Sequence, residues 1–284
     1  MPRFMDASPL MRSSVLAPGA ASPGVSPDVD AAGRHVWVIL PTYNEADNLE
    51  PFVRAVLPRL REVAGECRIL VVDDGSPDGT GELADGLAAE LAEVQVLHRT
   101  AKEGLGRAYL AGFAVALAAG ATVVVEMDAD FSHDPADLPR LVAATDRADV
   151  AVGSRYVEGG GVGDWGPMRR AVSRAGTTYA RLVLGAPTRD LTAGFKAFRS
   201  EVLTTLDLEG VHANGYGFQI ELTYRALQAG FHIVEVPIVF RDRRAGASKM
   251  TIHIALEALW KVGVLRLRLH GADRAAGSRP GVRG

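Results

Sequence analysis

Short apolar runs alternate with helical patterns along the first half of the chain, and this alternation constrains the fold more than any other feature. The expected strands cover residues 36–40, 68–72, 94–97, 123–127 and 150–153. The expected helices between them cover residues 48–60, 80–91, 105–119 and 138–144. Helices that join successive strands make those strands parallel. The sequence therefore predicts an α/β fold with a mainly parallel sheet and helices on both faces.

The two ends of the chain differ from this alternating region. Residues 1–33 are rich in Ala, Ser, Pro and Gly without a helical or strand period, and residues 271–284 are polar and basic. We expect both to be disordered tails. The first tail lacks the unbroken apolar run of a signal peptide. Between the tails we expect one domain over residues 34–250, followed by an amphipathic helix over residues 251–270.

Charge and cysteine content exclude several classes of function. The 284 residues include 31 Lys and Arg against 34 Asp and Glu, for a net charge of -3. This near balance gives no electrostatic basis for nucleic acid as a partner. The single cysteine, Cys67, excludes an internal disulfide framework and is typical of a reducing compartment. The most apolar stretch, residues 109–125, is divided by Gly120 into a helix and a strand, so it is not expected to span a membrane.

Acidic or polar residues follow four of the expected strands. They are Glu45 after the first strand, Asp73 and Asp74 after the second, Asp128 and Asp130 after the fourth, and Arg155 after the fifth. Ligands of parallel sheets bind beyond the carboxyl ends of the strands. The convergence of four such ends therefore predicts a polar binding site at one edge of the sheet.

Each of these groups alone has two interpretations. Asp128 and Asp130 supply hard oxygen ligands that suit Mg²⁺ or Mn²⁺, but they also fit a turn followed by a helix N-cap at Asp134. Asp73 and Asp74 fit either a turn or a carboxylate that accepts hydrogen bonds from a base or ribose. Residues 102–107 begin a helix and have weak phosphate-binding potential, because they lack a complete glycine-rich motif.

Several motifs occur together and in a fixed order. They are residues 40–45, 72–80, 128–133, 153–156, 190–196 and 215–219, then Arg243 and residues 247–249. In this set the chain resembles the inverting glycosyltransferase family 2, and within it the polyprenol (dolichol) monophosphate mannose synthases. The resemblance covers about residues 36–249 and implies the nucleotide-diphospho-sugar transferase (GT-A) fold with a Rossmann-like sheet. Residues 34–250 would then be the catalytic domain.

The resemblance implies a role for each matching residue. The guanosine of GDP-mannose would be held by Pro41, Tyr43, Glu45, Val72 and Asp74. Ribose, diphosphate and a divalent Mg²⁺ or Mn²⁺ would be held by Asp128, the Ala129 backbone and Asp130. Ser132 stands near the metal where some members carry Gln. The phosphates of the donor and of a lipid acceptor would be gathered by Arg155, Arg243 and Lys249, and Asp128, Asp130 and Arg155 would be catalytic.

The implied reaction moves mannose from GDP to a polyprenyl phosphate and inverts the sugar carbon, giving polyprenyl β-mannosyl phosphate and GDP. A phosphate monoester has a second pKa near about 6, so it is a dianionic nucleophile at neutral pH and requires no strong protein base. The sequence accordingly offers no histidine-centred triad. We interpret His133 and His253 as isolated structural residues.

The polyprenyl acceptor requires a membrane surface. Residues 241–249 form a mixed-charge segment, which fits either a solvated loop or a lid over phosphates with Gly246 as hinge. Residues 251–269 alternate apolar and basic side chains, which fits either an interfacial helix or a helix packed on the domain. We expect a cytoplasmic protein, peripheral on the cytoplasmic face of the membrane, with a separate integral membrane protein as candidate anchor.

Three other functions fit parts of the pattern. The nearest is transfer of glucose from UDP-glucose to polyprenyl phosphate on the same fold. A receiver-type phosphoacceptor domain also has an acidic pair after a strand and a later Asp, here Asp128. A sugar-nucleotide binding module without catalysis is disfavoured, because both carboxylates of residues 128–130 and both late basic residues are present.

Overall fold

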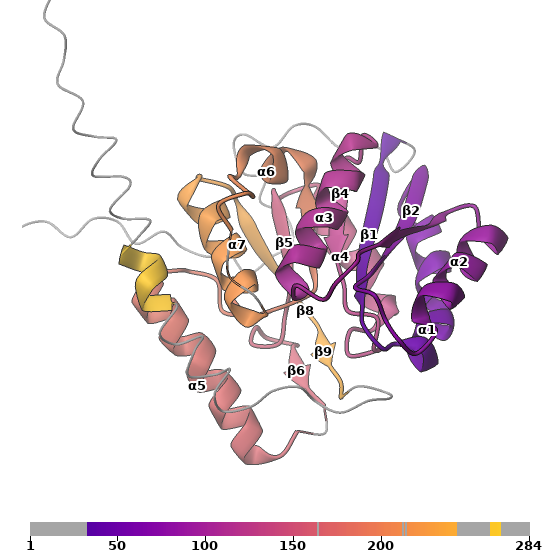
Figure 1. Cartoon of the computed structure of the whole chain (residues 1–284). Helices are drawn as coiled ribbons and strands as arrows, with labels where there is room; N and C mark the ends of the chain where they lie inside the picture. Colours follow the sequence, from indigo (N-terminus) through magenta and orange to yellow (C-terminus); the bar gives the residue numbers. More distant parts are fainter. Residues whose placement is uncertain (1–32, 164, 212, 214, 243–261, 268–284) are drawn as a thin grey trace, which may run out of the picture.

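The computed structural model describes residues 33–163, 165–211, 213, 215–242 and 262–267. In its first half, strands and helices alternate as the sequence predicts (Figure 1). The strands are β1 (His35–Thr42), β2 (Glu66–Asp73), β3 (Val94–His98), β4 (Val123–Glu126) and β5 (Val150–Ser154). The helices are α1 (Ala46–Arg61), α2 (Thr80–Glu90), α3 (Leu105–Ala118) and α4 (Leu138–Ala144), the last preceded by the 3₁₀ turn η2 (Pro135–Asp137).

The second half contains elements that the sequence pattern did not assign. Its strands are β6 (Gly161–Val162), β7 (Lys196–Arg199), β8 (Ile233–Pro237) and β9 (Val239–Phe240). Its helices are α5 (Pro167–Leu184), α6 (Ser200–Thr205) and α7 (Tyr216–Gln228). Residues 262–267 are helical and belong to the expected helix at 251–270, whose other residues lie outside the described part. The expected tails also lie outside it, except for Gly33, and the domain boundaries stay predictions.

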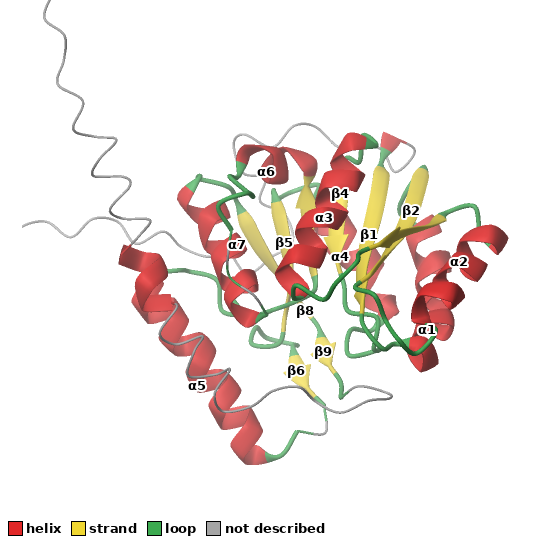
Figure 2. Ribbon diagram, in the orientation of Figure 1, coloured by secondary structure: helices red, strands yellow, loops and turns green. Residues whose placement is uncertain are grey.

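The main sheet has seven strands in the order β3-β2-β1-β4-β7-β5-β8. All neighbours are parallel except β7, which runs antiparallel to both β4 and β5. A separate pair, β6 and β9, lies beside the carboxyl edge of this sheet (Figure 2). Because β7 runs against its neighbours, the loop that leads into it arrives at the edge where β4 and β5 end. The chain thus adds residues 190–195 to the predicted ligand edge.

Both faces of the sheet are covered by helices, as predicted. On β1, Val36, Val38 and Leu40 pack with α1, α2 and α4, whereas Trp37 and Ile39 pack with α3, α6 and α7. Alternate residues of a strand point to opposite faces, so a strand buried on both faces has a continuous apolar sequence. This is why the strands could be found in the sequence as unbroken apolar runs.

Helix α5 lies apart from these two layers, at the lower left of Figure 1. Pro167 occupies its first turn and Gly185 ends it with a left-handed φ of 65°, both common boundary signals. It buries only Thr177, Ala180 and Leu184, and the last two pack in a small cluster with Val262. Among the residues that the structure describes, no helix combines the length and apolar character needed to cross a bilayer.

Candidate active site

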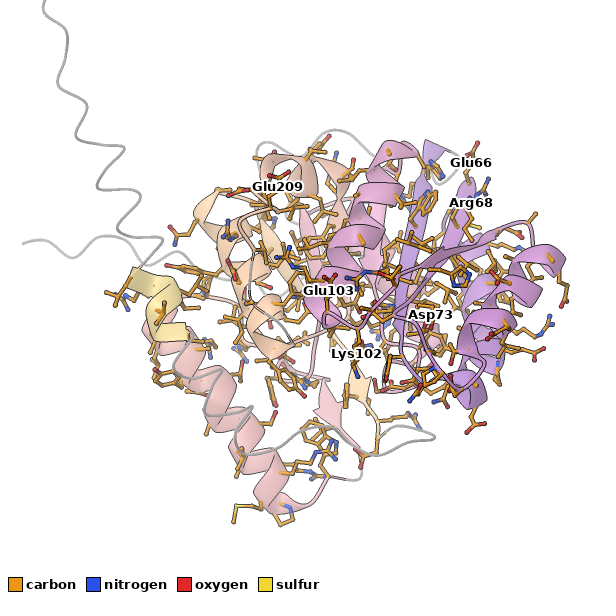
Figure 3. The ribbon with its side chains drawn as sticks, viewed as in Figure 1. Glu66, Arg68, Asp73, Lys102, Glu103 and Glu209 are labelled. Carbon is orange, nitrogen blue, oxygen red and sulfur yellow. The ribbon has the colours of Figure 1, made fainter. Side chains whose placement is uncertain are left out.

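The carboxyl ends of β1, β2, β4 and β5 converge on one cleft of about 330 Å³. Most of the described residues proposed from sequence line it: Pro41, Tyr43, Glu45, Asp74, Asp128, Ala129, Asp130, Ser132 and Arg155. Val72 does not, because its side chain is buried in the core beneath α3. Arg243 and Lys249 lie outside the described residues. Figure 3 shows Lys102 and Asp73 at this edge, whereas Glu66 and Arg68 mark the opposite end of β2.

Two loops that form one side of the cleft are held together by hydroxyl and carboxylate side chains. The backbone N–H of Asn44 donates to Ser76 Oγ at 3.0 Å, and that of Glu45 donates to Thr80 Oγ1 at 2.9 Å. The Ala46 N–H donates to Asp78 Oδ2 at 3.2 Å. These bonds fix the loop after β1 against the loop after β2, so the 72–80 motif acts first as a structural clasp.

The two carboxylates of Asp73 and Asp74 have different tasks. Asp73 accepts hydrogen bonds from the backbone N–H and hydroxyl of Ser76, which is turn chemistry. Asp74 lines the cleft and forms an ion pair with Arg99. Burial raises the pKa of Asp74, against the opposing effect of Arg99. Sequence analysis left both interpretations open for this pair. The structure shows turn chemistry for Asp73, and a role of Asp74 toward a base or ribose stays a prediction.

Arg99 and Lys102 are basic residues on the same side of the cleft as Tyr43 and Asp74. Sequence analysis did not include them in the site. Arg99 follows β3 and bridges Asp74 and Glu103. Lys102 lines the cleft with its ammonium 3.7 Å from the centroid of the Tyr43 ring. Their position directly after a parallel strand was the available signal, since polar groups after the other strands had already been selected on that ground.

The segment after β4 places both of its acidic residues at the same cleft, and its backbone bends directly after the second one. Phe131 has a left-handed φ of 62°, and its ring packs edge-on against Phe52 at 5.0 Å. Such a backbone is unfavourable for a bulky residue and persists when surrounding packing holds it. Asp128 and Asp130 line one cavity, as expected for residues two apart in an extended segment, which share a face.

The oxygen atoms of this segment suit a hard divalent cation. Asp130 is 3% exposed and accepts a hydrogen bond from the Ser132 N–H at 2.9 Å. The Ser132 hydroxyl is buried and has no hydrogen-bond partner among the residues that the structure describes. An orphaned buried hydroxyl beside two carboxylates fits a metal site. No group of three His, Cys, Asp or Glu side chains suited to a metal occurs among the described residues.

His133 is part of the cleft rather than isolated, which corrects the sequence interpretation. Its Nδ1 accepts a hydrogen bond from the backbone N–H of Asp128 at 3.3 Å, and its ring lies against Phe195 and Phe240. Burial lowers the pKa of His133 to about 4. A neutral imidazole is required for Nδ1 to accept, so His133 positions the backbone of the acidic segment.

Arg155 lies on the other side of the cleft in a buried ion pair. Its Nε and one Nη donate to the two carboxylate oxygens of Asp190, both at 2.7 Å, and the same Nη donates to Thr192 Oγ1 at 2.6 Å. Burial alone would raise the pKa of Asp190, but Arg155 holds it below its usual range. Arg155 is therefore a fixed cation rather than a flexible phosphate clamp, and its partner Asp190 was missed in the sequence.

A second buried charge pair lies beneath the cleft floor. Lys196 Nζ donates to the backbone oxygen of Gln219 at 3.0 Å and to its side-chain oxygen, and lies 4.0 Å from a carboxylate oxygen of Glu126. Both charged side chains are fully buried, and in the described part of the chain neither Glu126 oxygen has a hydrogen-bond partner. Burial raises the pKa of Glu126 to about 7 and lowers that of Lys196 to about 8. The sequence signal for this buried pair was the glutamate that ends the apolar run Val123–Glu126.

An acidic cleft at the carboxyl edge of a mainly parallel sheet, with one antiparallel strand inserted, defines the class of nucleotide-diphospho-sugar transferases with the GT-A fold. The model of the family described as glycosyl transferase family 2 matches residues 37–206, and the chain belongs to this family. The predicted family and fold are therefore confirmed. Family membership and the seven-stranded sheet also argue against a receiver-type phosphoacceptor domain.

Two curated relatives and one solved structure illustrate the similarity. A polyprenol monophosphomannose synthase of Mycolicibacterium smegmatis is 49% identical over 256 residues, which are 89% of this chain and 95% of that protein. An undecaprenyl-phosphate mannosyltransferase of Micrococcus luteus is 49% identical over 80% of this chain and 92% of that protein. Glucosyl-3-phosphoglycerate synthase of Mycobacterium tuberculosis, solved with Mn²⁺ and UDP-glucose, is 22% identical with a TM-score of 0.60, covering 84% of this chain and 81% of that one.

Proposed function

We propose that this protein transfers mannose from GDP-mannose to the phosphate of a polyprenyl lipid, with release of GDP. The observation that carries the proposal is the convergence of Glu45, Asp74, Asp128, Asp130 and Arg155 on one cleft. The names of the two relatives at 49% identity support mannose as the sugar and a polyprenyl phosphate as the acceptor. The choice of GDP as the nucleotide rests on the sequence resemblance.

The nucleoside would lie between the two clasped loops of the donor side. A carboxylate such as Asp74 can accept the two N–H groups on the Watson–Crick edge of guanine, and Glu45 can accept from ribose or base. Tyr43 and Pro41 add apolar surface on the same side of the cleft. Val72 would contribute through its backbone and the packing under the site, because its side chain does not reach the cleft.

The diphosphate would lie over Asp128, the Ala129 backbone and Asp130. With Ser132, these residues would hold Mg²⁺ or Mn²⁺, which neutralises negative charge on the departing GDP. His133 keeps the Asp128 backbone in place through the hydrogen bond that its Nδ1 accepts. The proposal requires a divalent cation, and the assay below compares Mg²⁺ with Mn²⁺.

The acceptor phosphate would approach from the side of Arg155. Its oxygen forms a new bond to the sugar C1 as the bond from C1 to the GDP oxygen breaks, and the electron pair of that bond remains on GDP. Displacement in line inverts C1 and gives the β-linked product. Arg155, held by Asp190, supplies fixed positive charge for bringing two anions together. Arg243 and Lys249, outside the described residues, would add to it.

The site of action would be the cytoplasmic face of the membrane, with the protein bound peripherally. The reason is chemical, since a polyprenyl phosphate keeps its chain in the bilayer and its phosphate at the surface. A separate integral membrane protein would serve as the anchor if lipid contact alone does not suffice.

Transfer of label from GDP-mannose to a polyprenyl phosphate tests the proposal. We expect a lipid-linked mannose in Mg²⁺ or Mn²⁺ and none after chelation with EDTA. UDP-glucose, tested in parallel, should give far less product. Preferential use of UDP-glucose would replace the proposed donor by the alternative one, and absence of transfer from either donor would overturn the proposed reaction.

A further inference from the structure

The side chain of Gln219 has a hydrogen-bonding group that neither the fold nor the contacts proposed above use. Gln219 lies in the first turn of α7, is 2% exposed and lines the cleft. Its amide nitrogen, Nε2, is buried and has no hydrogen-bond partner among the residues that the structure describes. An unpaired buried amide costs stability, so its presence at the wall of a binding cleft points to a ligand that pairs with it.

Lys196 determines which end of the Gln219 carboxamide is the oxygen. Lys196 Nζ donates to Gln219 Oε1 and, at 3.0 Å, to the backbone oxygen of the same residue. An ammonium group has only donors, so it requires the carboxamide oxygen beside it and leaves Nε2 at the other end. The Gln219 backbone oxygen also accepts the Thr223 hydroxyl at 2.8 Å. The main chain and the oxygen of Gln219 are thus both held, which fixes the position of Nε2.

Glu126 is the other polar group near this carboxamide beneath the cleft floor. Burial raises the pKa of Glu126 to about 7, against the opposing effects of Lys196 and of the Gln219 carboxamide. Neither Glu126 oxygen has a hydrogen-bond partner in the described part of the chain, however. Glu126 therefore attracts the carboxamide without pairing with its N–H groups, which remain available to a ligand in the cleft.

An open space in the cleft borders Nε2, and Gly194 leaves it open. An added methyl group on this glycine would lie 3.9 Å from Gln219 Nε2, 3.6 Å from Asp128 Oδ2 and 3.5 Å from His133 Cε1. These are ordinary contact distances, and the φ of Gly194 is not left-handed. Packing and backbone conformation would therefore both permit an alanine. By contrast, a methyl group on Gly106 would come within 2.8 Å of a backbone oxygen and of an aromatic ring.

The space is bordered by the two parts of the cleft that the proposed reaction joins. One border is Asp128, the first residue of the segment proposed to hold the diphosphate. The other is the loop of residues 190–195, in which Thr192 accepts a hydrogen bond from Arg155 at 2.6 Å. The transferred sugar must lie between the departing diphosphate and the acceptor phosphate. Nε2 therefore faces the place of a group that is rich in hydroxyl oxygens, which accept hydrogen bonds.

We propose that Gln219 donates a hydrogen bond through Nε2 to a hydroxyl oxygen of the transferred sugar, with Lys196 as the residue that positions it. Gly194 leaves the room that the sugar ring needs beside Asp128 and Gln219. This role rests on the proposed function and goes beyond it, because it identifies residues that select the sugar. A buried donor discriminates against a sugar that lacks the matching hydroxyl, since the donor is then left unpaired.

Calorimetric binding of GDP-mannose and of GDP, with Mg²⁺ and without acceptor, tests the role of Gln219. Gln219→Met keeps the length of the side chain and removes the amide, while Lys196 retains the backbone oxygen and Glu126. We expect the Kd of GDP-mannose to rise about three- to tenfold and that of GDP, which lacks the mannose, to change by less than about twofold. Gln228→Met, at the exposed end of the same helix, is the matched control and should bind both as the natural chain does.

Gly194→Ala tests the space without disturbing the buried pair beneath it. The methyl group meets its neighbours at ordinary distances, so the melting temperature should stay close to that of the natural chain. The Kd of GDP-mannose should rise about tenfold or more, because the methyl group competes with the sugar, and the Kd of GDP should change by less than about twofold. Gly176→Ala on α5, where a methyl group meets nothing within 4 Å, is the control.

Donor analogues that each lack one mannose hydroxyl identify the oxygen that Nε2 contacts. For the natural chain, loss of that hydroxyl should raise the Kd about three- to tenfold. Gln219→Met should bind the same analogue as it binds GDP-mannose, while losses for the other hydroxyls persist. A merely structural role of Gln219 would instead weaken GDP and every analogue alike.

The role of Gln219 is overturned if Gln219→Met leaves the Kd of GDP-mannose unchanged, weakens GDP equally, or responds to every analogue as the natural chain does. It is also overturned if only the KM for polyprenyl phosphate rises, since Nε2 would then serve the acceptor. If Gln219→Met does not fold, unchanged binding of GDP-mannose by Gly194→Ala overturns the sugar site.

The proposed function fails in a different way. If the natural chain binds and uses UDP-glucose in place of GDP-mannose, the proposed donor is wrong, and the ratio of the Kd values for UDP-glucose and UDP still tests Gln219. If the natural chain transfers mannose and Gln219→Met binds GDP-mannose normally, the proposed function stands and the role of Gln219 does not. A natural chain that binds no sugar nucleotide overturns both.

Discussion

The two sides of the cleft are stabilised by different forces. On the side of Glu45 and Asp74, where we propose that the donor binds, the hydroxyls of Ser76 and Thr80 and the carboxylate of Asp78 accept hydrogen bonds from backbone N–H groups and fix two loops. On the acceptor side, the fixed groups are buried charges, with Arg155 against Asp190 and Lys196 close to Glu126. A clasp built mainly on hydroxyls leaves no buried charge behind when one partner is removed. A charged one provides a fixed field for an anionic acceptor, but it exposes the fold to large losses when one partner is removed.

The strongest test of this contrast is Asp130→Ala on the donor side. We expect mannose transfer to fall by about 10³-fold or more, because a metal contributes several kcal/mol to stabilising the departing charge. The melting temperature should change little, since the loops are held by other residues. Transfer rate and thermal unfolding are measured on the same samples, with Asp137→Ala on η2 as the control for loss of one acidic residue. A folded variant that keeps its activity would refute the metal role.

Asp190→Asn tests the acceptor side, where we expect an effect on stability as well as activity. Both partners of the Arg155–Asp190 pair are almost fully buried. Leaving the arginine without its carboxylate should reduce the free energy of unfolding by about 3–5 kcal/mol. The measurement is the urea midpoint at an unchanged slope. Glu90→Ala, which removes the exposed pair with Arg54, should leave the midpoint nearly unchanged. An equal response of the two variants would show that the buried pair has no special role.

Glu126→Gln tests the buried pair of Glu126 and Lys196 through the pH dependence of stability. The pKa of Glu126 is raised from 4.5 to about 7 by burial, so the native state binds this proton more tightly than the unfolded state does. The contribution of Glu126 to stability is therefore most favourable at low pH and declines as the pH rises from 4.5 to about 7. The variant should flatten the unfolding free energy measured across this window. Glu50→Gln on the exposed side of α1 is the control, and an unchanged slope in Glu126→Gln would contradict the shift.

The smallest expected effect is that of Lys102→Ala on the donor side. Lys102 is exposed and lies over the partly buried Tyr43 ring. Such a cation contributes about 0.5–1 kcal/mol, so the KM for GDP-mannose should rise about two- to fivefold with kcat unchanged. Lys102→Arg should restore most of the affinity. Steady-state kinetics at saturating acceptor provide the measurement. A fall in kcat at constant KM would instead place Lys102 with the groups that act on the departing diphosphate.

The donor side could be predicted from the sequence because its signals are local. Apolar runs give the strands, and polar residues directly after each run give the cleft. This reasoning places Glu45, Asp74, Asp128 and Asp130 in one cleft, where the structure also has them. The roles of Asp73 and Asp74 could not be separated, because only the bound partners, Ser76 and Arg99, distinguish them.

The acceptor side could not be predicted to the same degree because its signals are distant in the chain. Arg155 and Asp190 are 35 residues apart, and their pairing depends on the antiparallel entry of β7. Strand β7 has four residues, too few for a clear period. Helix α5 buries so few side chains that its pattern lacks the single apolar face toward a core by which helices are usually found.

The antiparallel entry of β7 has a consequence for how proteins of this architecture can diversify. The chain leaves the sheet at the end of β5 and re-enters it at β7, and both points lie at the rim of the same cleft. The intervening residues 155–195, which include α5, form an excursion that begins and ends beside the cleft. Insertions, deletions or exchanges within it leave the strand order intact. Sequence changes in residues 155–195 can therefore alter the surface that meets the acceptor while the proposed donor pocket stays the same.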